Sequence, residues 1–568
     1  MHSAWIAYDS TNNERISALD HSFVQTTLML MGAHIQYHYG DENIIASHGS
    51  VEGANFVVGN CRYRKVVLPK LETIDETTFE LLCRFLDNGG KIYAADSLPY
   101  RIGGKIDSRI RSLNDRVITI PSDAELRSAL FAADGFTNVS VSSKRGEVGA
   151  IHMCVRHIGG ERAYFFVNLD NEHAYDVKIT LRGEKNAVRL ALENLKVYEC
   201  DMITTDAGVE IYMHFEPMQS VVLLAGENLP DSIRFNRNTS TLIPAREWNI
   251  EECSENILTL DYISYSADGS DYSEYKPVLG VMDELLARRA NSDLLIKYRF
   301  TVADGTDLEA MKELTMVMEY DESWEITVNG APVRHDLVSW WKDREFKAIN
   351  IKERVQIGLN EIVIKGKFYQ RQKVYDVLFG ENVLETERNK LTYDTEIESI
   401  YLIGDFGVET SARFTEGDRK ALYCDGPFRI TNRRHTLIGG EIVRQGYPFF
   451  SGTMKISQEF EISAKPTNRL YLRFPKPYAV LVKIYVNDKF VKILPWAEYA
   501  ADITDSLKVG TNKLTVELIT GNRNLFGPHH RPEGESYVVT PNSFGPNGNY
   551  SPSNWRDRYC FVKTGFGN

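Results

Sequence analysis

One unusual pattern occurs twice in this sequence, and it constrains the fold more than any other feature. The clearer copy runs from Ile484 to His530 and reads IYVNDKFVKILPWAEYAADITDSLKVGTNKLTVELITGNRNLFGPHH. The weaker copy spans Ile326–Gly366 and contains ITVNGAPV, two adjacent tryptophans and FKAINIKERVQIGLNEIVIKG. In both copies a Val-Asn-Gly or Val-Asn-Asp turn precedes aromatic residues on a loop, and Gly-x-Asn precedes an alternating strand. The most economical explanation is a repeated β-sandwich module.

Length and charge limit the architecture and the partners. A chain of 568 residues is too long for one hydrophobic core, and it predicts roughly three or four domains. The formal net charge of −13, with no dense stripe of Lys and Arg, argues against nucleic acid as a partner. No apolar run reaches the ~18 residues that would span a bilayer, so no membrane partner is expected.

The seven cysteines are scattered and odd in number, and none of them form a Cys-x-x-Cys pair. This usage fits neither a disulfide framework nor a zinc site, and we expect no metal or cofactor. Acidic turns such as Asp268-Gly269-Ser270-Asp271 are too common to argue a calcium site, so a structural calcium ion stays an open alternative. The N-terminus has no basic segment followed by an apolar one, and we therefore expect a cytoplasmic protein.

The first segment, 1–135, alternates helix and strand and predicts an α/β domain. Apolar residues at helical spacing over 16–30 predict one helix. Thr73-x-x-Glu76 predicts a capping box that opens a second helix. With the strands at Val66 and Ile92, this second helix makes a βαβ unit, which implies a parallel sheet. A third helix is expected over 122–133.

From about residue 136 the hydrophobic period changes from 3.6 to 2, which is typical of strands. Residues 136–226 predict a small antiparallel β-domain. Residues 227–415 predict a β-sandwich with the first copy of the repeat, and 416–568 a galactose-binding-like jelly roll with the second. The predicted fold class is therefore multidomain and mainly β, with an α/β domain at the N-terminus.

The loops of the two copies offer candidates for carbohydrate binding. Trp340 and Trp341 follow the first Val-Asn-Gly turn, where a tryptophan can stack on a sugar. Asp343 can accept hydrogen bonds from vicinal hydroxyls. The alternative is that one of the two tryptophans closes the end of the sandwich. Trp496 lies on the connecting loop of the second copy and is the fourth candidate.

A second group of candidates ends the second copy and has no counterpart in the first. It consists of Arg523, Asn524, His529 and His530 in one polar loop. We predict a loop that contacts sugar or bridges domains, with a purely structural loop as the alternative. Adjacent histidines usually point to different sides, so no metal is expected there. The sequence has no Gly-x-Ser-x-Gly, His-Glu-x-x-His or P-loop pattern, and catalytic residues stay unassigned.

Several stretches resemble, in this order, the sequences of a known family. They include HIQYHYGDENIIASHGSVEG at 34–53, RAYFFVNLDNE at 162–172, YLIGDFGV at 401–408 and GNRNLFGPHH at 521–530. They resemble the C-terminal half of large bacterial glycoside hydrolases of the α-L-rhamnosidase-like type, which carry a family-2-type sugar-binding jelly roll after the catalytic part. The resemblance covers essentially the whole chain, and the last two strings are its most specific parts.

The resemblance implies an order of domains: a catalytic (β/α)8 barrel, an amidotransferase-like α/β domain, a small β-domain and then jelly-roll sandwiches. By this comparison the α/β domain lacks its first strand here. The barrel and its two catalytic carboxylates have no counterpart in the sequence. The α/β domain also carries no nucleophile elbow, so amidotransferase chemistry is not expected.

Three functions remain as alternatives. The first is an accessory part of a glycoside hydrolase that acts on plant or microbial polysaccharide; this part would bind carbohydrate and support a barrel on a separate chain. The second is an active glycosidase with a site between the jelly rolls and the α/β domain. The third is a structural interaction module without sugar affinity. The first alternative predicts an exposed apolar patch or an open strand position beside Val66–Leu68.

Overall fold

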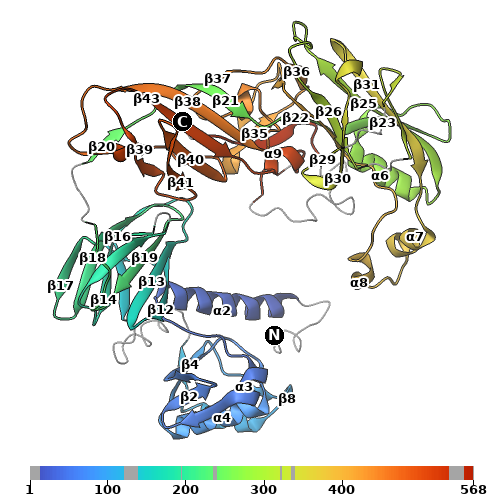
Figure 1. Ribbon diagram of the computed structural model, residues 1–568. Coiled ribbons are helices and arrows are strands. Elements are labelled where there is room, and N and C mark those ends of the chain that lie inside the picture. Colours follow the sequence, from blue (N-terminus) through green and yellow to red (C-terminus); the bar gives the residue numbers. More distant parts are fainter. Residues whose placement is uncertain are drawn as a thin grey trace. The chain divides into compact units, whose positions relative to one another are not determined.

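The computed structural model describes residues 13–120, 138–192, 195–233, 239–319, 323–333, 339–531, 533–536 and 555–566. The chain divides into two compact units, Met1–Arg237 with Trp496–Glu498, and Asn238–Pro495 with Tyr499–Asn568. Strands predominate over helices in the described residues, which confirms a multidomain, mainly β chain (Figure 1). The third helix expected over 122–133 lies outside the described residues.

A short parallel sheet forms the centre of the N-terminal part of the first unit. Its three strands pair in the order β4-β6-β9: β4 (Lys65–Leu68), β6 (Lys91–Ala95) and β9 (Ile118–Ile120). α4 (Glu76–Asp87) connects β4 to β6, which confirms the predicted βαβ unit. The predicted capping box is wrong, because Asp75 is the N-cap of α4. Thr73 instead lies in β5 (Thr73–Ile74) and pairs with Arg101.

Helices cover both faces of this sheet. Alternate residues of a strand point to opposite faces, and in β6 Ile92 packs in the cluster that holds α4, whereas Tyr93 packs with Leu30 of α2 (Asn13–Gly32). β4 is an edge strand, and β6 is its only partner among the described strands. The open position predicted beside Val66–Leu68 stays a prediction, because residues 1–12 and 121–137 lie outside the described part of the chain.

Smaller elements surround this sheet. They are α3 (Glu42–His48), β1 (Gly49–Glu52), β2 (Asn55–Val58), β3 (Cys61–Tyr63), β7 (Arg101–Ile102), β8 (Lys105–Ile106) and the 3₁₀ helix η1 (Ser108–Leu113). The strands β1, β2 and β3 form an antiparallel sheet of their own, while β7 joins β5 to β8.

The rest of the first unit is a sandwich of two antiparallel sheets, with the orders β11-β10-β14-β18-β17 and β12-β13-β19-β15-β16. The strands are β10 (Val139–Ser143), β11 (Gly146–Glu147), β12 (Ile151–Ile158), β13 (Glu161–Asn168), β14 (Tyr175–Arg182), β15 (Ala187–Ala191), β16 (Lys196–Glu199), β17 (Met202–Thr205), β18 (Gly208–Phe215) and β19 (Ser220–Ala225). In β19 every second residue is buried, as a strand with one face on a core requires. The helix α2 contacts β12 of this sandwich (Figure 1).

The second unit contains two sandwiches. The first packs the sheet β22-β32-β26-β30-β29 against a larger sheet, which runs β24-β23-β25-β31-β27-β28 and continues from β25 through β36 to β33. Its elements are β22 (Asn256–Leu260), β23 (Tyr262–Ala267), β24 (Lys276–Pro277), α6 (Val278–Ala287), β25 (Ser292–Val302), β26 (Leu314–Met318), β27 (Glu325–Val328), β28 (Ala331–Pro332), β29 (Ser339–Trp341), β30 (Asp343–Asn350), η2 (Lys352–Arg354), β31 (Gly358–Phe368), α7 (Gln372–Phe379), α8 (Glu385–Arg388), β32 (Ile400–Gly404), β33 (Gly407–Glu409) and β36 (Arg429–Thr431).

The second sandwich packs the sheet β37-β21-β38-β43-β40-β41 against β20-β39-β42, and β34-β35-β44 forms a separate small sheet. Its elements are β20 (Thr239–Leu242), β21 (Glu247–Cys253), β34 (Thr415–Glu416), η3 (Asp418–Lys420), β35 (Ala421–Cys424), β37 (Thr436–Ile438), η4 (Val443–Gln445), β38 (Thr453–Ile462), β39 (Arg469–Arg473), β40 (Leu481–Val486), β41 (Lys489–Leu494), β42 (Ala500–Asp502), η5 (Thr504–Ser506), β43 (Gly510–Ile519), α9 (Arg523–Phe526) and β44 (Tyr559–Val562).

Strand pairing crosses the predicted boundary between residues 415 and 416. β20 and β21 precede the first sandwich in sequence, yet they pair with β39 and β38 of the second. In the other direction, β36 pairs with β25 of the first sandwich at Val302 and Ile430. The two sandwiches therefore exchange strands within one unit, an arrangement that a linear division of the sequence does not express.

The two copies of the repeat contain the same hydrogen-bond network. In the first copy Asn329 Nδ2 donates to Asn360 Oδ1 at 2.8 Å, and Asn360 Nδ2 donates to Gly358 O at 3.0 Å. In the second copy Asn487 Nδ2 donates to Asn512 Oδ1 at 2.9 Å, and Asn512 Nδ2 donates in the same way to the carbonyl of the glycine two residues before it, at 2.9 Å. Asn360 and Asn512 are fully buried. The predicted repeat is thus confirmed in these contacts.

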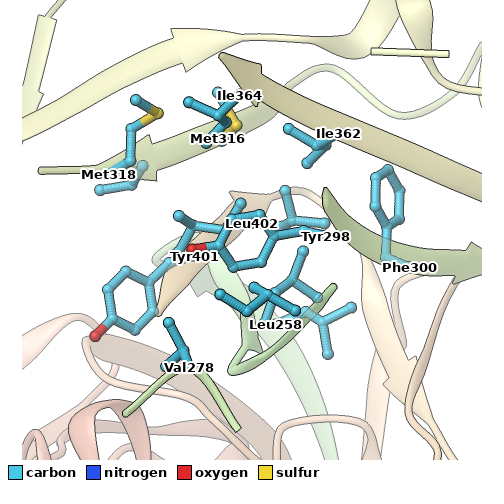
Figure 2. Close-up of a cluster of buried hydrophobic side chains, with 14 of the residues drawn as sticks. Leu258, Val278, Tyr298, Phe300, Met316, Met318, Ile362, Ile364, Tyr401 and Leu402 are labelled. Atoms are coloured by element: carbon cyan, nitrogen blue, oxygen red, sulfur yellow. The ribbon is translucent and has the colours of Figure 1, made fainter. Parts of the chain in front are cut away.

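The core of the first sandwich lies between its two sheets. Figure 2 shows Met316 and Met318 of β26 close to Ile362 and Ile364 of β31. Tyr401 lies at the margin of this cluster, and its hydroxyl points away from the other labelled residues (Figure 2). The outer side of β32, which carries Tyr401, is where the candidate site begins.

Candidate functional site

A tight hairpin between β29 and β30 presents the first group of predicted residues. Lys342 occupies the turn with a φ of 59°, and Trp341 pairs with Asp343 across it. The pairing register shifts between Trp340 and Trp341, and the two tryptophans differ in exposure. Trp340 is 60% exposed, whereas Trp341 is half-buried. Asp343 is exposed, and its Oδ1 accepts a hydrogen bond from the Glu345 amide at 3.0 Å.

Trp341 belongs to an aromatic cluster that joins the two sandwiches. Its ring centroid lies 6.5 Å from that of Tyr401, which in turn lies 5.8 Å from Phe526 of α9. Phe346 of β30 contacts both Tyr401 and Phe526, with centroids 5.9 Å apart in each case. One tryptophan therefore packs internally, and the other is available to solvent.

Lys342 makes a polar link between the same two loops. Its Nζ donates to Ser451 O at 3.3 Å and Oγ at 3.2 Å, and Ser451 Oγ donates to Asn522 Oδ1 at 2.6 Å. Asn522 immediately precedes the predicted Arg523 loop. The tryptophan hairpin and the polar loop, which are far apart in sequence, are thus neighbours in the second unit.

Carboxylates from three chain segments surround the hairpin. Glu319 follows β26, Glu396 and Glu398 precede β32, and Glu345 lies in β30 beside Asp343. The pKa of Glu319 is raised, first by the surrounding protein and then by the charges of Glu396, Asp343 and Glu345. We call these five carboxylates, together with Trp340, the hairpin face.

Glu398 is the most perturbed member of the hairpin face. Its side chain is exposed to solvent, yet the protein around it, the charges of Glu319 and Glu396, and a hydrogen bond with Glu396 raise its pKa to about 7. With a pKa of about 7, Glu398 is partly protonated at neutral pH and carries less negative charge than an ordinary glutamate.

The second group of predicted residues is turned inward. Arg523 Nε donates to Glu535 Oε2 at 2.8 Å. Asn524 is buried; its Nδ2 donates to Val562 O at 2.9 Å and its Oδ1 accepts from Val562 N at 2.8 Å. His529 Nε2 donates to Asn524 O at 2.9 Å, and burial lowers the pKa of His529 to about 3, so this ring is neutral. These contacts hold β44 against α9.

His530 completes a buried network with Asp261, which lies between β22 and β23. His530 Nε2 is 2.9 Å from Asp261 Oδ2, Tyr559 donates to Asp261 Oδ1 at 2.7 Å, and His530 Nδ1 donates to Arg556 O at 2.7 Å. The ring of Trp555 stacks on His530 with centroids 4.2 Å apart. Burial alone would raise the pKa of Asp261, but the charge and hydrogen bond of His530 hold it below its usual value. The network connects the first sandwich to the C-terminal segment.

The structure brings the predicted residues together only in part. Trp340, Trp341 and Asp343 form one hairpin, and Arg523, Asn524, His529 and His530 form the adjoining buried loop. Trp496, on the loop between β41 and β42, is 42% exposed and lies outside both groups. The carboxylates at Glu319, Glu396 and Glu398 were not predicted. The only available sequence signal was the alternation Glu396-Ile397-Glu398 just before the apolar run of β32.

Within the described residues, no group of three or more His, Cys, Asp or Glu side chains is arranged to hold a metal ion. The helices that the structure describes include none that is both long and apolar enough to cross a membrane.

No protein-family model matches the chain, and neither does any curated protein. Among solved structures, it is similar to a rhamnosidase from Novosphingobium sp. PP1Y, with 16% identity, a TM-score of 0.30, and coverage of 64% of this chain and 36% of that one. An α-L-rhamnosidase from Streptomyces avermitilis complexed with L-rhamnose gives 10% identity, a TM-score of 0.20, and coverage of 74% and 34%. An apo exo-carrageenase GH42 from Bacteroides ovatus gives 12% identity, a TM-score of 0.25, and coverage of 37% and 27%. The chain thus spans 36% or less of the length of these three proteins.

Proposed function

We propose that this chain is a carbohydrate-binding and scaffolding part of a glycoside hydrolase that acts on plant or microbial polysaccharide. The hairpin face is its binding surface. The observation that carries the proposal is the exposure of Trp340 beside Trp341, which is anchored in the aromatic cluster. The sequence resemblance to rhamnosidase-like hydrolases supports the substrate class, and a barrel on a separate chain would be the partner.

The physical case rests on the difference between the two tryptophans. An exposed indole presents a large apolar surface to water, and covering it with the apolar face of a pyranose recovers roughly 25 cal/mol per Å² of buried apolar area. Asp343 and Glu345 follow Trp340 closely in sequence, and both are exposed. Their carboxylates can accept hydrogen bonds from sugar hydroxyls at the edge of the stacked ring.

The group around His530 has a different role in this proposal. Its members are buried and hydrogen-bonded to one another, so they position the C-terminal segment and do not contact sugar. A fixed contact between the two sandwiches keeps the hairpin rigid. Rigidity favours binding, because less conformational entropy is lost when the saccharide binds.

Affinity electrophoresis of the full chain tests the proposal, in gels that contain galactomannan, arabinoxylan, chitosan or polygalacturonate. We expect at least one polysaccharide to retard the protein, and Trp340→Ala to abolish the retardation without changing thermal stability. Trp341→Ala is the matched variant: it should lower stability, because its ring packs against Tyr401. Retardation in none of the gels, or retardation that survives Trp340→Ala, would refute the proposal and favour a structural module without sugar affinity.

A further inference from the structure

We infer that a surface of the second sandwich extends the hairpin face and binds the continuation of a long, neutral saccharide chain. This inference rests on the proposed function and specifies the length and the charge of its ligand. The surface, which we call the strand face, consists of Lys455, Lys483, Tyr485, Phe490, Thr515 and Glu517.

The strand face is the side of its sheet that points away from the core. Ile484 of β40 and Val516 of β43 are fully buried in the core of the second sandwich. Their neighbours Lys483, Tyr485 and Glu517 lie on the other side, because adjacent residues of a strand point to opposite faces. Strand pairing places Lys483 directly opposite Glu517.

One end of the strand face carries an exposed aromatic ring. Phe490 of β41 is 51% exposed, and its ring meets that of Tyr485 edge to face, with centroids 5.7 Å apart. The Tyr485 hydroxyl donates to Glu517 Oε2 at 3.1 Å, and Glu517 Oε1 accepts from Lys483 Nζ at 2.8 Å. An exposed ring with polar groups beside it suits a pyranose, which has apolar faces and hydroxyls around its edge.

The polar groups of the strand face keep hydrogen-bonding capacity for a ligand. An ammonium group has three donors, and each carboxylate oxygen can accept two hydrogen bonds. Within the described residues, Lys483 Nζ uses one donor, and each oxygen of Glu517 accepts one hydrogen bond. Thr515, which lies between Tyr485 and Ser457 across the sheet, is buried, and its hydroxyl has no partner among the described residues. Free donors and acceptors therefore lie side by side, as a sugar hydroxyl requires.

The ion pairs on this side of the sheet are one to one. Three Nζ–Oε pairs join Lys483 to Glu517 at 2.8 Å, Lys455 to Glu252 at 2.7 Å and Lys513 to Glu251 at 2.5 Å. Two further carboxylates, Glu459 and Glu461, lie farther along β38, past the row that contains Phe490. Since each ammonium already has a carboxylate, the pairs offer hydrogen bonds to neutral hydroxyls and no net charge for an ionic ligand.

The strand face begins close to the point where the hairpin is attached. Lys342 Nζ donates to Ser451 O at 3.3 Å, and Ser451 lies two residues before β38. Lys455, in the same strand, pairs with Glu517. Four residues separate Ser451 from Lys455, which is at most roughly 14 Å of extended chain. A saccharide that stacks on Trp340 and has several units can therefore continue onto the strand face.

Isothermal titration of the full chain tests this inference with β-1,4-linked mannose oligomers of three and six units, and with xylose oligomers of the same lengths. In at least one series we expect the six-unit oligomer to bind at least 10-fold more tightly than the three-unit one. Only the longer chain reaches both surfaces, and its second contact is intramolecular.

Phe490→Ala should reduce this gain from chain length to less than 2-fold. Glu517→Gln changes the polar part of the strand face at nearly constant shape, and it should reduce the gain as well. Phe165→Ala is the matched control, because it removes an exposed phenylalanine from β13 of the first unit, and it should leave the gain unchanged. Circular dichroism melting of each variant shows that it is folded.

The outcomes separate the inference from the proposed function. A gain that survives both Phe490→Ala and Glu517→Gln, or equal binding of three and six units, would overturn the inference and leave the proposed function standing. Retardation only by chitosan or polygalacturonate in the gels above would do the same, because these polymers are charged. Failure of every oligomer and every gel would overturn the proposed function itself, as would six-unit binding that Trp340→Ala leaves intact.

Discussion

The buried asparagine of the repeat, Asn512, offers the sharpest test of how the second unit is held together. Its Nδ2 donates to Lys508 O and Gly510 O at 2.8 and 2.9 Å. Its Oδ1 accepts from Lys508 N and Asn487 Nδ2, both at 2.9 Å. Asn512→Ala deletes all four hydrogen bonds at a position with no solvent exposure. Water therefore cannot readily replace the lost partners.

The expected magnitude follows from these four bonds. A typical hydrogen bond contributes about 1 kcal/mol net, and a buried group left without a partner costs about 1–3 kcal/mol. The variant loses four bonds and leaves several main-chain and side-chain groups unsatisfied, so we expect a loss of about 3–5 kcal/mol. That is a large share of the 5–15 kcal/mol that ordinarily stabilises a folded domain.

Urea unfolding of the full chain, followed by circular dichroism and tryptophan fluorescence, measures the loss. Asn360→Ala removes the equivalent side chain from the first copy and should cost the same within about 1 kcal/mol. Asn350→Ala is the control, because Asn350 is exposed and accepts one hydrogen bond, from Lys352 N at 3.0 Å. A loss below about 1 kcal/mol for Asn512→Ala, or equal losses for Asn512→Ala and Asn350→Ala, would refute the reasoning.

Two further predictions concern the second unit. Asp261→Asn should lower its stability by about 1–3 kcal/mol at pH 7, because the variant removes the buried carboxylate that accepts hydrogen bonds from His530 and Tyr559. The folded pKa of Asp261 lies below the unfolded value, so the contribution of this pair is present above about pH 4 and is lost as the pH falls through the folded pKa. Gly366→Ala should cost at least about 1–3 kcal/mol, because a Cβ there would lie 2.0 Å from the buried ring of Trp324.

Each of these two predictions has its own measurement and control. Urea unfolding at pH 7 and at pH 3 should show a smaller acid-induced loss for Asp261→Asn than for the wild type; equal losses would mean that this pair does not contribute to the acid sensitivity. Gly358→Ala is the matched glycine, with a φ of 89° and open space around its Cβ position. It should cost about 1 kcal/mol from backbone strain alone. If Gly358→Ala were the more costly of the two, the packing argument at Trp324 would fail.

The repeat could be predicted from sequence because its signal is local. Asn329 and Asn487 both adopt positive φ at the turn, at 51° and 52°, a conformation that asparagine tolerates better than most residues. Gly358 and Gly510 do the same before the following strand, at 89° and 95°. Because such backbone conformations favour particular residue types, they can be recognised in the sequence.

The partition of the strands could not be predicted in this way. β21 reads as an ordinary strand in sequence, and nothing local says that it pairs with β38, some two hundred residues later. The carboxylates of the hairpin face have the same origin. Glu319 and Glu398 are separated along the chain and meet because β26 and β32 are neighbours in one sheet. Long-range pairing decides both features, and a single sequence carries little information about it.

The comparison of the two copies also explains why the first copy is the better candidate for binding. The same hydrogen bond closes both modules, from the turn asparagine to a main-chain carbonyl, but it spans 25 residues in the first copy (Asn329 to Arg354) and 19 in the second (Asn487 to Ser506). The extra length falls in the segment that contains the tryptophan hairpin. The network fixes the ends of this segment, so residues can be inserted between them at small cost to the module. Binding residues commonly lie on variable loops that a constant scaffold positions. In this repeat Trp340 lies in the variable part and Asn360 in the constant part.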